Sequence, residues 1–131
     1  MKRDFLKFRK NIEAMPKLKE DIFKIDKKIR FITIIDSKGK LIESQHKKDI
    51  ESTLNKKESS QSIKQIIGFW KENKKLFKKF GYPKYAIIEY DKIKRIIISL
   101  SQKELLYITT EPDSDHKKIL SKIFNYYLPK Y

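Results

Sequence analysis

The sequence offers few side chains that could perform chemistry, and they form no catalytic or metal-binding pattern. The two histidines, His46 and His116, each lack a second histidine at the spacing that would complete a metal-ligating face. Cysteine is absent, which excludes a thiol nucleophile, a disulfide framework and a Cys-ligated zinc. Local spacing also suggests no set of serine, histidine and aspartate. We therefore expect no catalytic site, no metal and no cofactor.

The most polar cluster is Asp113-Ser114-Asp115-His116, whose carboxylates could hold a hard cation. The cluster stands directly before a predicted helix, where acidic and hydroxyl side chains satisfy free backbone amides. We favour this second interpretation, with Asp113 or Ser114 as the N-cap. Asp36 could similarly be a catalytic carboxylate. It precedes Gly39 in a predicted tight turn, however, and aspartate in such a place usually stabilises the turn.

Phosphate-binding loops need closely spaced glycines, and the three glycines here, Gly39, Gly68 and Gly81, stand far apart. Gly81 is followed by Pro83, a pattern typical of the end of a helix. Gly68 falls inside a predicted helix, where it either permits the close approach of another element or is merely tolerated. The chain therefore resembles a binding protein more than an enzyme, and we expect no small-molecule substrate.

The elements that must position any binding surface fit one domain of 131 residues. Residues 1–16 predict a basic helical extension, and residues 17–131 predict an α/β domain. No apolar run approaches the roughly 20 residues that cross a bilayer, and no secretion signal is recognisable. We accordingly expect a cytoplasmic protein with no membrane span.

The order of elements predicts an α+β fold, with a single five-stranded antiparallel sheet flanked by helices. A short helix, an apolar strand, a turn and a weaker strand at the sheet edge come first, followed by a long polar connection. The middle helix, three closely spaced strands and a last helix complete the order α-β-β-α-β-β-β-α. The predicted ranges are Lys17–Asp26, Ile29–Ile35, Leu41–Gln45, His46–Ser60, Gln61–Phe80, Lys84–Tyr90, Ile93–Leu100 and Lys103–Thr110, with Ile119, Leu120, Ile123 and Tyr127 on the core side of the last helix.

The middle helix, Gln61–Phe80, has more apolar residues than a single contact with a sheet requires. At about 100° per residue, one stripe faces the core and consists of Ile63, Ile66, Ile67, Trp70 and Phe77. Phe69, Leu76 and Phe80 lie on a flank beside that stripe. We predict that this flank docks a partner, because large apolar side chains anchor protein interfaces. The alternative is that the N-terminal helix covers the flank within the same chain.

Two stretches resemble a known family. KIDKKIRFITIIDSKGKLIES, Lys24–Ser44, combines a short helix, an apolar strand, Asp36, a two-residue spacer, Gly39 and a returning strand. YAIIEYDKIKRIIISLSQKELLYITTEPDSDHKKIL, Tyr85–Leu120, combines three strands, a proline and a helix. In these stretches the chain resembles the roadblock / dynein-light-chain superfamily, which has a profilin-like architecture, and especially small uncharacterised archaeal proteins of that architecture.

This resemblance implies a homodimer or heterodimer that serves as a scaffold or regulator of small GTPases, motors or membrane-associated complexes. It also implies that the middle helix and the strand Lys84–Tyr90 form the dimer surface. The predicted interface residues are Phe69, Leu76, Phe80, Tyr85 and Ile87. The lysine-rich connection His46–Ser60 departs from the family pattern. Fold alone does not establish function.

The formal net charge of +15 is the other strong feature of the sequence. Such a charge favours polyanions such as nucleic acid, anionic lipid or an acidic protein. The alternative function is therefore nucleic-acid binding through Lys71, Lys74, Lys75, Lys78 and Lys79, with Tyr85, Tyr90 and Tyr107 as possible stacking residues. Only four of the basic residues are arginines, and the lysine excess could equally reflect a coding bias or an ordinary solvated face.

Overall fold

The computed structural model describes residues 15–36, 38–46, 56–72, 74–101 and 103–126. The predicted extension over residues 1–16 lies outside these ranges except for Met15 and Pro16. These two residues begin the first described helix, α2 (Met15–Ile25). The polar connection His46–Ser60 also lies largely outside them, between residues 47 and 55.

Five antiparallel strands form one sheet in the order β2-β1-β5-β4-β3, which confirms the predicted fold. β1 is an inner strand and is buried on both faces, as its unbroken apolar sequence predicts. β2 lies at one edge, also as predicted, and β3 lies at the other. The bounds are β1 (Ile29–Asp36), β2 (Leu41–His46), β3 (Tyr85–Glu89), β4 (Lys94–Ser101) and β5 (Glu104–Thr110).

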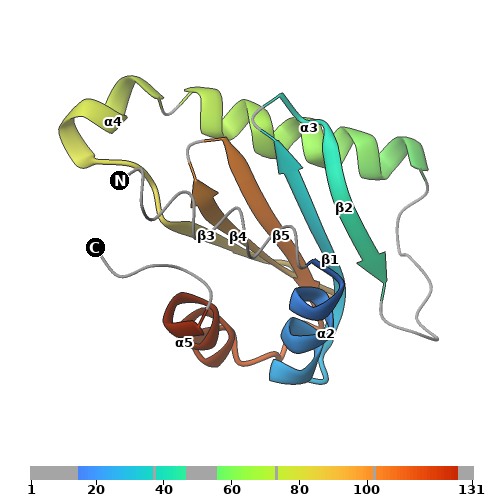
Figure 1. The fold of residues 1–131 in the computed structure, drawn as a ribbon. Coiled ribbons are helices and arrows are strands. Elements are labelled where there is room, and N and C mark those ends of the chain that lie inside the picture. Colours follow the sequence, from blue (N-terminus) through green and yellow to red (C-terminus); the bar gives the residue numbers. More distant parts are fainter. Residues whose placement is uncertain (1–14, 37, 47–55, 73, 102, 127–131) are drawn as a thin grey trace.

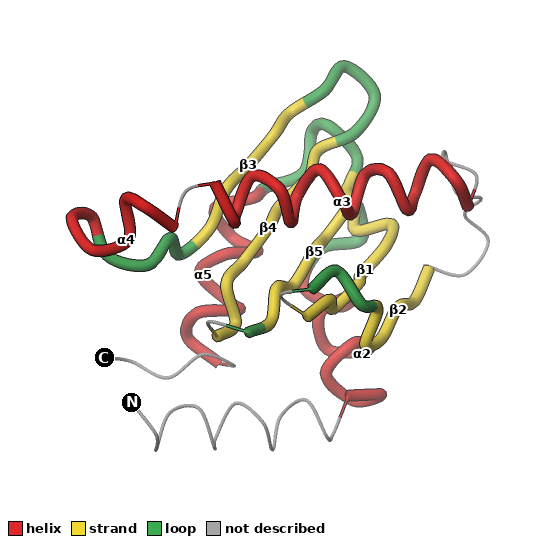
Figure 2. The backbone as a smooth tube through the Cα atoms, turned by 90° about the horizontal axis from the view of Figure 1, so that it is seen from above, coloured by secondary structure: helices red, strands yellow, loops and turns green. Residues whose placement is uncertain are grey.

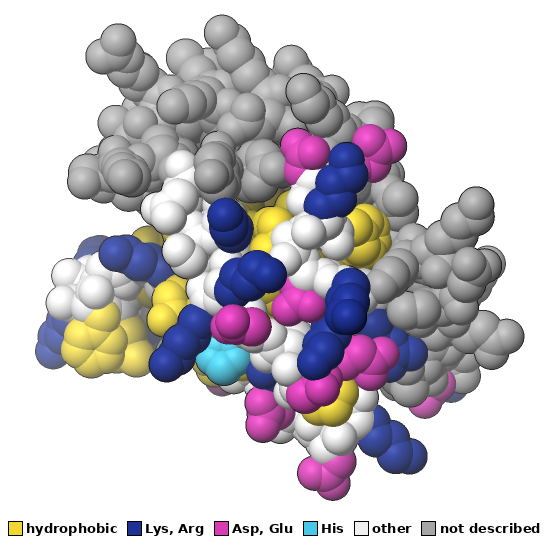
Figure 3. Space-filling model, turned by 90° about the horizontal axis from the view of Figure 1, so that it is seen from below, with side chains coloured by type: hydrophobic (Ala, Val, Ile, Leu, Met, Phe, Trp, Pro, Cys, Tyr) yellow, Lys and Arg dark blue, Asp and Glu magenta, His cyan; other side chains and the backbone are white. Residues whose placement is uncertain are grey.

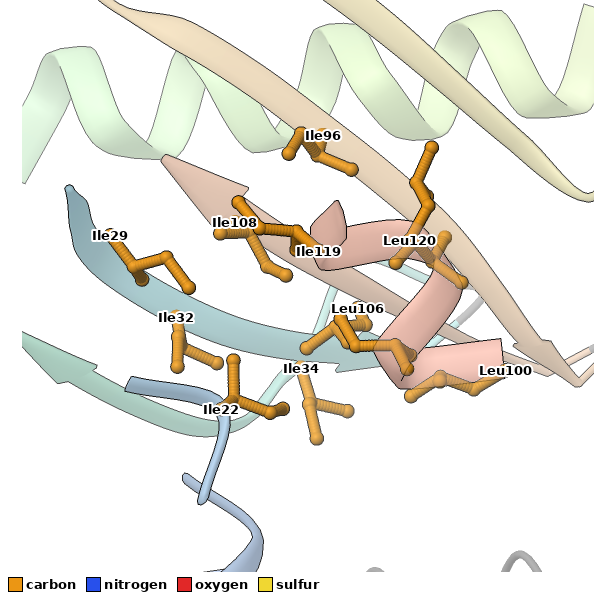
Figure 4. Close-up of a cluster of buried hydrophobic side chains, with 12 residues drawn as sticks. Ile22, Ile29, Ile32, Ile34, Ile96, Leu100, Leu106, Ile108, Ile119 and Leu120 are labelled. Carbon is orange, nitrogen blue, oxygen red and sulfur yellow. The ribbon is translucent and has the colours of Figure 1, made fainter. Parts of the chain in front are cut away.

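The sheet separates two helical layers (Figure 1). α3 (Lys56–Glu72) and α4 (Lys74–Phe80) lie on one side, whereas α2 and α5 (His116–Tyr126) lie on the other. Each side has its own core. On the α2 and α5 side, isoleucines and leucines of the sheet and both helices interlock (Figure 4), including Ile22, Ile34, Ile98, Leu106 and Ile119. The core under α3 consists of Ile35, Ile66, Ile67, Trp70, Ile97, Leu105 and Tyr107.

The prediction of one continuous middle helix, Gln61–Phe80, is wrong in its bounds. The structure has α3, which begins at Lys56, and a separate α4, which begins at Lys74. Asn73 stands between them in the sequence. Residue 73 lies outside the described part of the structure.

The turn between β1 and β2 has the chemistry predicted for Asp36. Its Oδ1 accepts hydrogen bonds from the backbone amides of Lys38 at 2.9 Å and Lys40 at 2.8 Å. Gly39 has a φ of 86°, a left-handed conformation that favours glycine. The Asp36 carboxylate therefore closes the turn, and this position is structural.

Candidate interaction surface

α4 projects past the corner of the sheet at which β3 begins (Figures 1 and 2). Phe77 anchors α4 to the molecule, because it packs against the core under α3 and its ring lies 4.8 Å from the ring of Tyr82. Burial raises the pKa of the Tyr82 hydroxyl. Leu76 and Phe80 are on another side of the helix and are 42% and 79% exposed. The projecting helix thus presents two large apolar side chains to its surroundings.

α3 divides its apolar residues in the way the sequence predicts. Ile66, Ile67 and Trp70 are buried in the core, with Ile63 packed beside them. Phe69 is 56% exposed on the flank, although its ring lies 5.8 Å from that of Trp70. The flank residues of both helices are therefore only partly enclosed by their own protomer, and a partner could still bury them.

β3 is an edge of the sheet, because it hydrogen-bonds to β4 alone among the described strands. It follows α4 in the chain and is the edge nearest to that helix. Its predicted interface residues face the α5 side: Tyr85 is 50% exposed with its ring 6.1 Å from that of Phe124, and Ile87 packs half-buried on that core. Phe69 is on α3, on the opposite face of the sheet. The predicted interface set is thus divided between two faces that meet at the β3 edge.

Two further exposed apolar residues near this edge, Ile88 and Tyr90, were not among the predicted interface residues. Ile88, which pairs with Arg95 of β4, is 42% exposed, and Tyr90, which follows β3, is 45% exposed. Strict alternation from Ile87 would have placed Ile88 on the α3 face. That signal was available, but the sequence did not reveal that α3 leaves this end of β3 uncovered.

The tyrosines do not form the stacking platform considered for nucleic acid. Tyr107 is buried, which contradicts an exposed stacking role. Its ring and that of Tyr90 lie 5.8 Å and 5.1 Å from the guanidinium of Arg95, which is itself buried. These contacts are cation–π interactions that stabilise the sheet surface. Tyr85 and Tyr90 are exposed but belong to the β3 edge described above.

The lysines of α3 and α4 concentrate positive charge on one side of the sheet. Residues 56–80 contain eight lysines and two glutamates, a net charge of +6. The side chains of Lys71, Lys75, Lys78 and Lys79 are exposed, while the side chain of Lys74 is outside the described part of the structure. On the opposite face, acidic side chains are intermingled with basic ones (Figure 3). The helices of both layers are basic, and the opposite face differs in carrying acidic side chains from α2 and from the segments beside α5, among them Glu20, Asp113 and Asp115.

The acidic cluster before α5 is structural, and its N-cap differs from the prediction. Asp115 caps the helix, because its Oδ1 accepts a hydrogen bond from the backbone amide of Lys118 at 3.1 Å. Ser114 is buried, with its Oγ 2.6 Å from Thr110 Oγ1. Asp113 accepts a hydrogen bond from Lys28 Nζ at 2.7 Å, and this contact lowers the pKa of Asp113.

Lys94, like Asp113, has protein partners near the start of α5. Lys94 is almost fully buried and donates to the carbonyl of Ser114 at 2.8 Å, with His116 Nδ1 at 3.0 Å and Glu89 Oε1 at 3.3 Å. This network fastens β4 to the start of α5. No three histidine or acidic side chains in the described ranges converge as metal ligands. His46, the other candidate, has its side chain outside those ranges.

Comparison of the whole architecture with solved structures identifies the fold. MglB from Thermus thermophilus superposes with a TM-score of 0.65 at 12% identity, over 78% of this chain and 74% of that one. An MglB with a tetrameric arrangement gives 0.70 at 11% identity, over 83% and 79%. A Roadblock/LC7 domain from Streptomyces avermitilis gives 0.57 at 8% identity, over 82% and 92%. The chain has the roadblock fold.

At the level of sequence, no family model matches and no similar curated protein is found. Identities of this size show the roadblock fold alone. Within the described part of this roadblock fold, no helix combines the length and apolar character needed to cross a membrane.

Proposed function

We propose that this chain is a non-enzymatic interaction module that pairs with a second copy through the β3 edge. We further propose that the pair acts in the cytoplasm as a scaffold or regulator within a larger complex, such as one built around a small GTPase. The domain over residues 17–131 would form the pair, and residues 1–16 would be an extension to it. The observation that carries this proposal is the exposed apolar pair Leu76 and Phe80 on a helix that projects beyond the sheet.

An open sheet edge favours pairing because its unpaired backbone amides and carbonyls are ready to accept another strand. β3 offers such an edge, and exposed apolar side chains border it on both faces, namely Tyr85 and Ile88. A second β3 could add in antiparallel orientation, which is an isologous contact between identical surfaces. α4 would then extend over the neighbouring protomer and bury Leu76 and Phe80.

The test is a measurement of mass by light scattering at tens of micromolar protein. Wild-type protein should be dimeric, and Leu76→Glu combined with Phe80→Glu should give a folded monomer. Each anchor contributes about 2 kcal/mol or more in typical interfaces, so the double variant should dissociate at least about a thousandfold more readily. Circular dichroism would show that the variant keeps its fold.

The opposite edge of the sheet supplies a matched control. Leu41 and Ile42 on β2 are 50% and 39% exposed, which is similar to Leu76. Leu41→Glu combined with Ile42→Glu adds the same charges to an edge that the proposal leaves unpaired. A wild-type protein that is strictly monomeric would contradict the proposal. So would a pair that survives the α4 substitutions but dissociates with those on β2.

The alternative to a protein partner is a polyanion. The exposed lysines of α3 and α4 and the net charge of +15 support it. Nucleic-acid binding through these lysines predicts an affinity that falls steeply with salt. Net charge by itself does not select among polyanions.

A further inference from the structure

The lysines of α3 form a row. Lys57, Lys64 and Lys71 are all exposed and follow one another at intervals of seven residues. Seven residues are nearly two helical turns, so these side chains project from one side of α3 about 10 Å apart along its axis. Lys75, Lys78 and Lys79 continue the exposed positive charge onto α4. We name these six residues the lysine face.

On α3, the row of lysines is separate from the apolar flank proposed for pairing. At about 100° per residue, Lys64 and Lys71 lie roughly 140–160° around α3 from Phe69. The two glutamates of α3, Glu58 and Glu72, lie within about 60° of Phe69 on the same projection. Negative charge is therefore placed beside the apolar flank and away from the row of lysines. A partner that covers Phe69 would leave Lys64 and Lys71 accessible.

Pairing through β3 would double this face, a step that rests on the proposed function. Identical antiparallel neighbours in one sheet are related by a two-fold axis perpendicular to the sheet. Such an axis keeps α3 and α4 of both copies on the same side. The twelve lysines would then share one broad surface, and the opposite surface would carry the intermingled acidic and basic side chains of α2, α5 and the segments beside them (Figure 3).

A bilayer surface suits this arrangement better than a nucleic acid does. α3 runs across the strands (Figure 2) and exposes one long side of the helix. None of the four arginines, which suit phosphate and base edges best, is on α3 or α4. A negatively charged membrane attracts clusters of lysine through its surface potential and needs no specific geometry. A flat row of lysines can approach such a plane along its whole length.

We propose that the lysine face docks the protein onto a membrane that contains anionic phospholipid. The bound orientation has α3 and α4 against the headgroups, with α2 and α5 facing the solvent. The attraction is electrostatic and involves no insertion of a helix. Each lysine near the surface strengthens binding about fivefold, so six from each copy suffice for stable attachment of a pair.

The test is co-sedimentation with two kinds of vesicle, one of phosphatidylcholine alone and one of phosphatidylcholine with about 30% phosphatidylserine, whose negative surface potential attracts basic clusters. Wild-type protein should bind only the anionic vesicles, and salt should weaken the binding. Lys64→Ala, Lys71→Ala and Lys78→Ala together should lower the affinity about a hundredfold. The matched control replaces three exposed lysines of the other layer with alanine, Lys24, Lys117 and Lys118. It removes the same charge and should bind nearly as wild type does.

Equal losses in the two triple variants would overturn the proposal, because net charge alone would then explain binding. Failure of the wild-type protein to bind anionic vesicles would also overturn it. So would a random duplex that binds more tightly than the vesicles and releases the protein from them. Light scattering on the same samples separates this proposal from the pairing proposal. A dimer that ignores vesicles contradicts the lysine face alone, whereas a monomer that binds them contradicts pairing alone.

Discussion

Replacing Gly68 with alanine should stabilise the protein. Gly68 lies inside α3, exposed, where glycine costs conformational entropy that alanine does not. A Cβ atom built at Gly68 meets nothing within 4 Å. The helical backbone at this position also needs no left-handed conformation, since only Gly39 and Gly81 have positive φ among the glycines. The substitution therefore gains helix propensity without a steric penalty.

The expected gain is the difference in propensity between glycine and alanine within a helix, about 0.8–1.0 kcal/mol. For a domain of this size, such a gain raises the melting temperature by roughly 2–5 °C. Urea denaturation followed by circular dichroism would measure it as a higher midpoint with an unchanged slope. Protein concentration must be held fixed, because pairing stabilises a protein by mass action.

Gly81→Ala provides the matched control with the opposite sign. Its Cβ would also meet nothing within 4 Å, but φ at Gly81 is +84°. Alanine in that conformation costs about 1–2 kcal/mol, so Gly81→Ala should destabilise the protein. If Gly68→Ala instead destabilises it, or breaks the dimer, another body must approach the outer surface of α3. That result would refute the reasoning that Gly68 is merely tolerated, and would extend the pairing surface onto α3.

Two further outcomes follow from the core and from the surface charges. Ile98→Ala, at a fully buried position on β4, should cost about 2–5 kcal/mol in denaturation experiments, and Ile98→Val about 0.5–1.5 kcal/mol. Similar losses for the two would contradict a tightly packed core. The Lys28–Asp113 hydrogen bond lowers the pKa of Asp113 below 3.8 and raises that of Lys28 above 10.5. Its contribution is present between these values and is lost as the pH falls through the lowered pKa or rises through the raised one. The free energy of unfolding should therefore fall slightly in acid for the wild-type protein and fall less for Asp113→Asn. If both proteins lose the same stability in acid, the Lys28–Asp113 pair is not the cause of the loss.

The sheet could be predicted because each strand carries its own signal. Ile29–Ile35 is apolar and β-branched on both faces, which predicts an inner strand, and Asp36 with Gly39 predicts the turn that follows. The strands between Tyr85 and Thr110 are joined too closely to be anything but antiparallel neighbours. These patterns are local, and the structure confirms them.

The parts that sequence reasoning missed depend on contacts between elements. Lys94 reads as an ordinary surface lysine, yet its alternation with Ile96 and Ile98 places it on an inward face beneath α5. Its ammonium can be buried only because the carbonyl of Ser114 and the side chains of His116 and Glu89 converge there. The N-cap of α5 also depends on contacts between elements, since Asp113, Ser114 and Asp115 are all residue types that favour the N-cap position. Which one caps α5 depends on where Lys28 and Thr110 engage the other two.

The net charge of +15 is unevenly distributed along the chain. A coding bias acts on every segment and would raise the net charge wherever the fold tolerates exposed side chains. Residues 81–115 have many exposed positions, yet they hold five basic and six acidic residues, a net charge of −1, against the +6 of residues 56–80. The net charge of a protein does not depend on where its charges lie. The electrostatic potential at its surface does, because charges act mainly within a screening length of about 10 Å. α5 also carries three lysines, Lys117, Lys118 and Lys122, so positive charge is enriched on α3 and α4 without being confined to them. What distinguishes α3 and α4 is that six exposed lysines follow one another along two helices on one side of the sheet, which is the placement that attachment to an anionic surface favours.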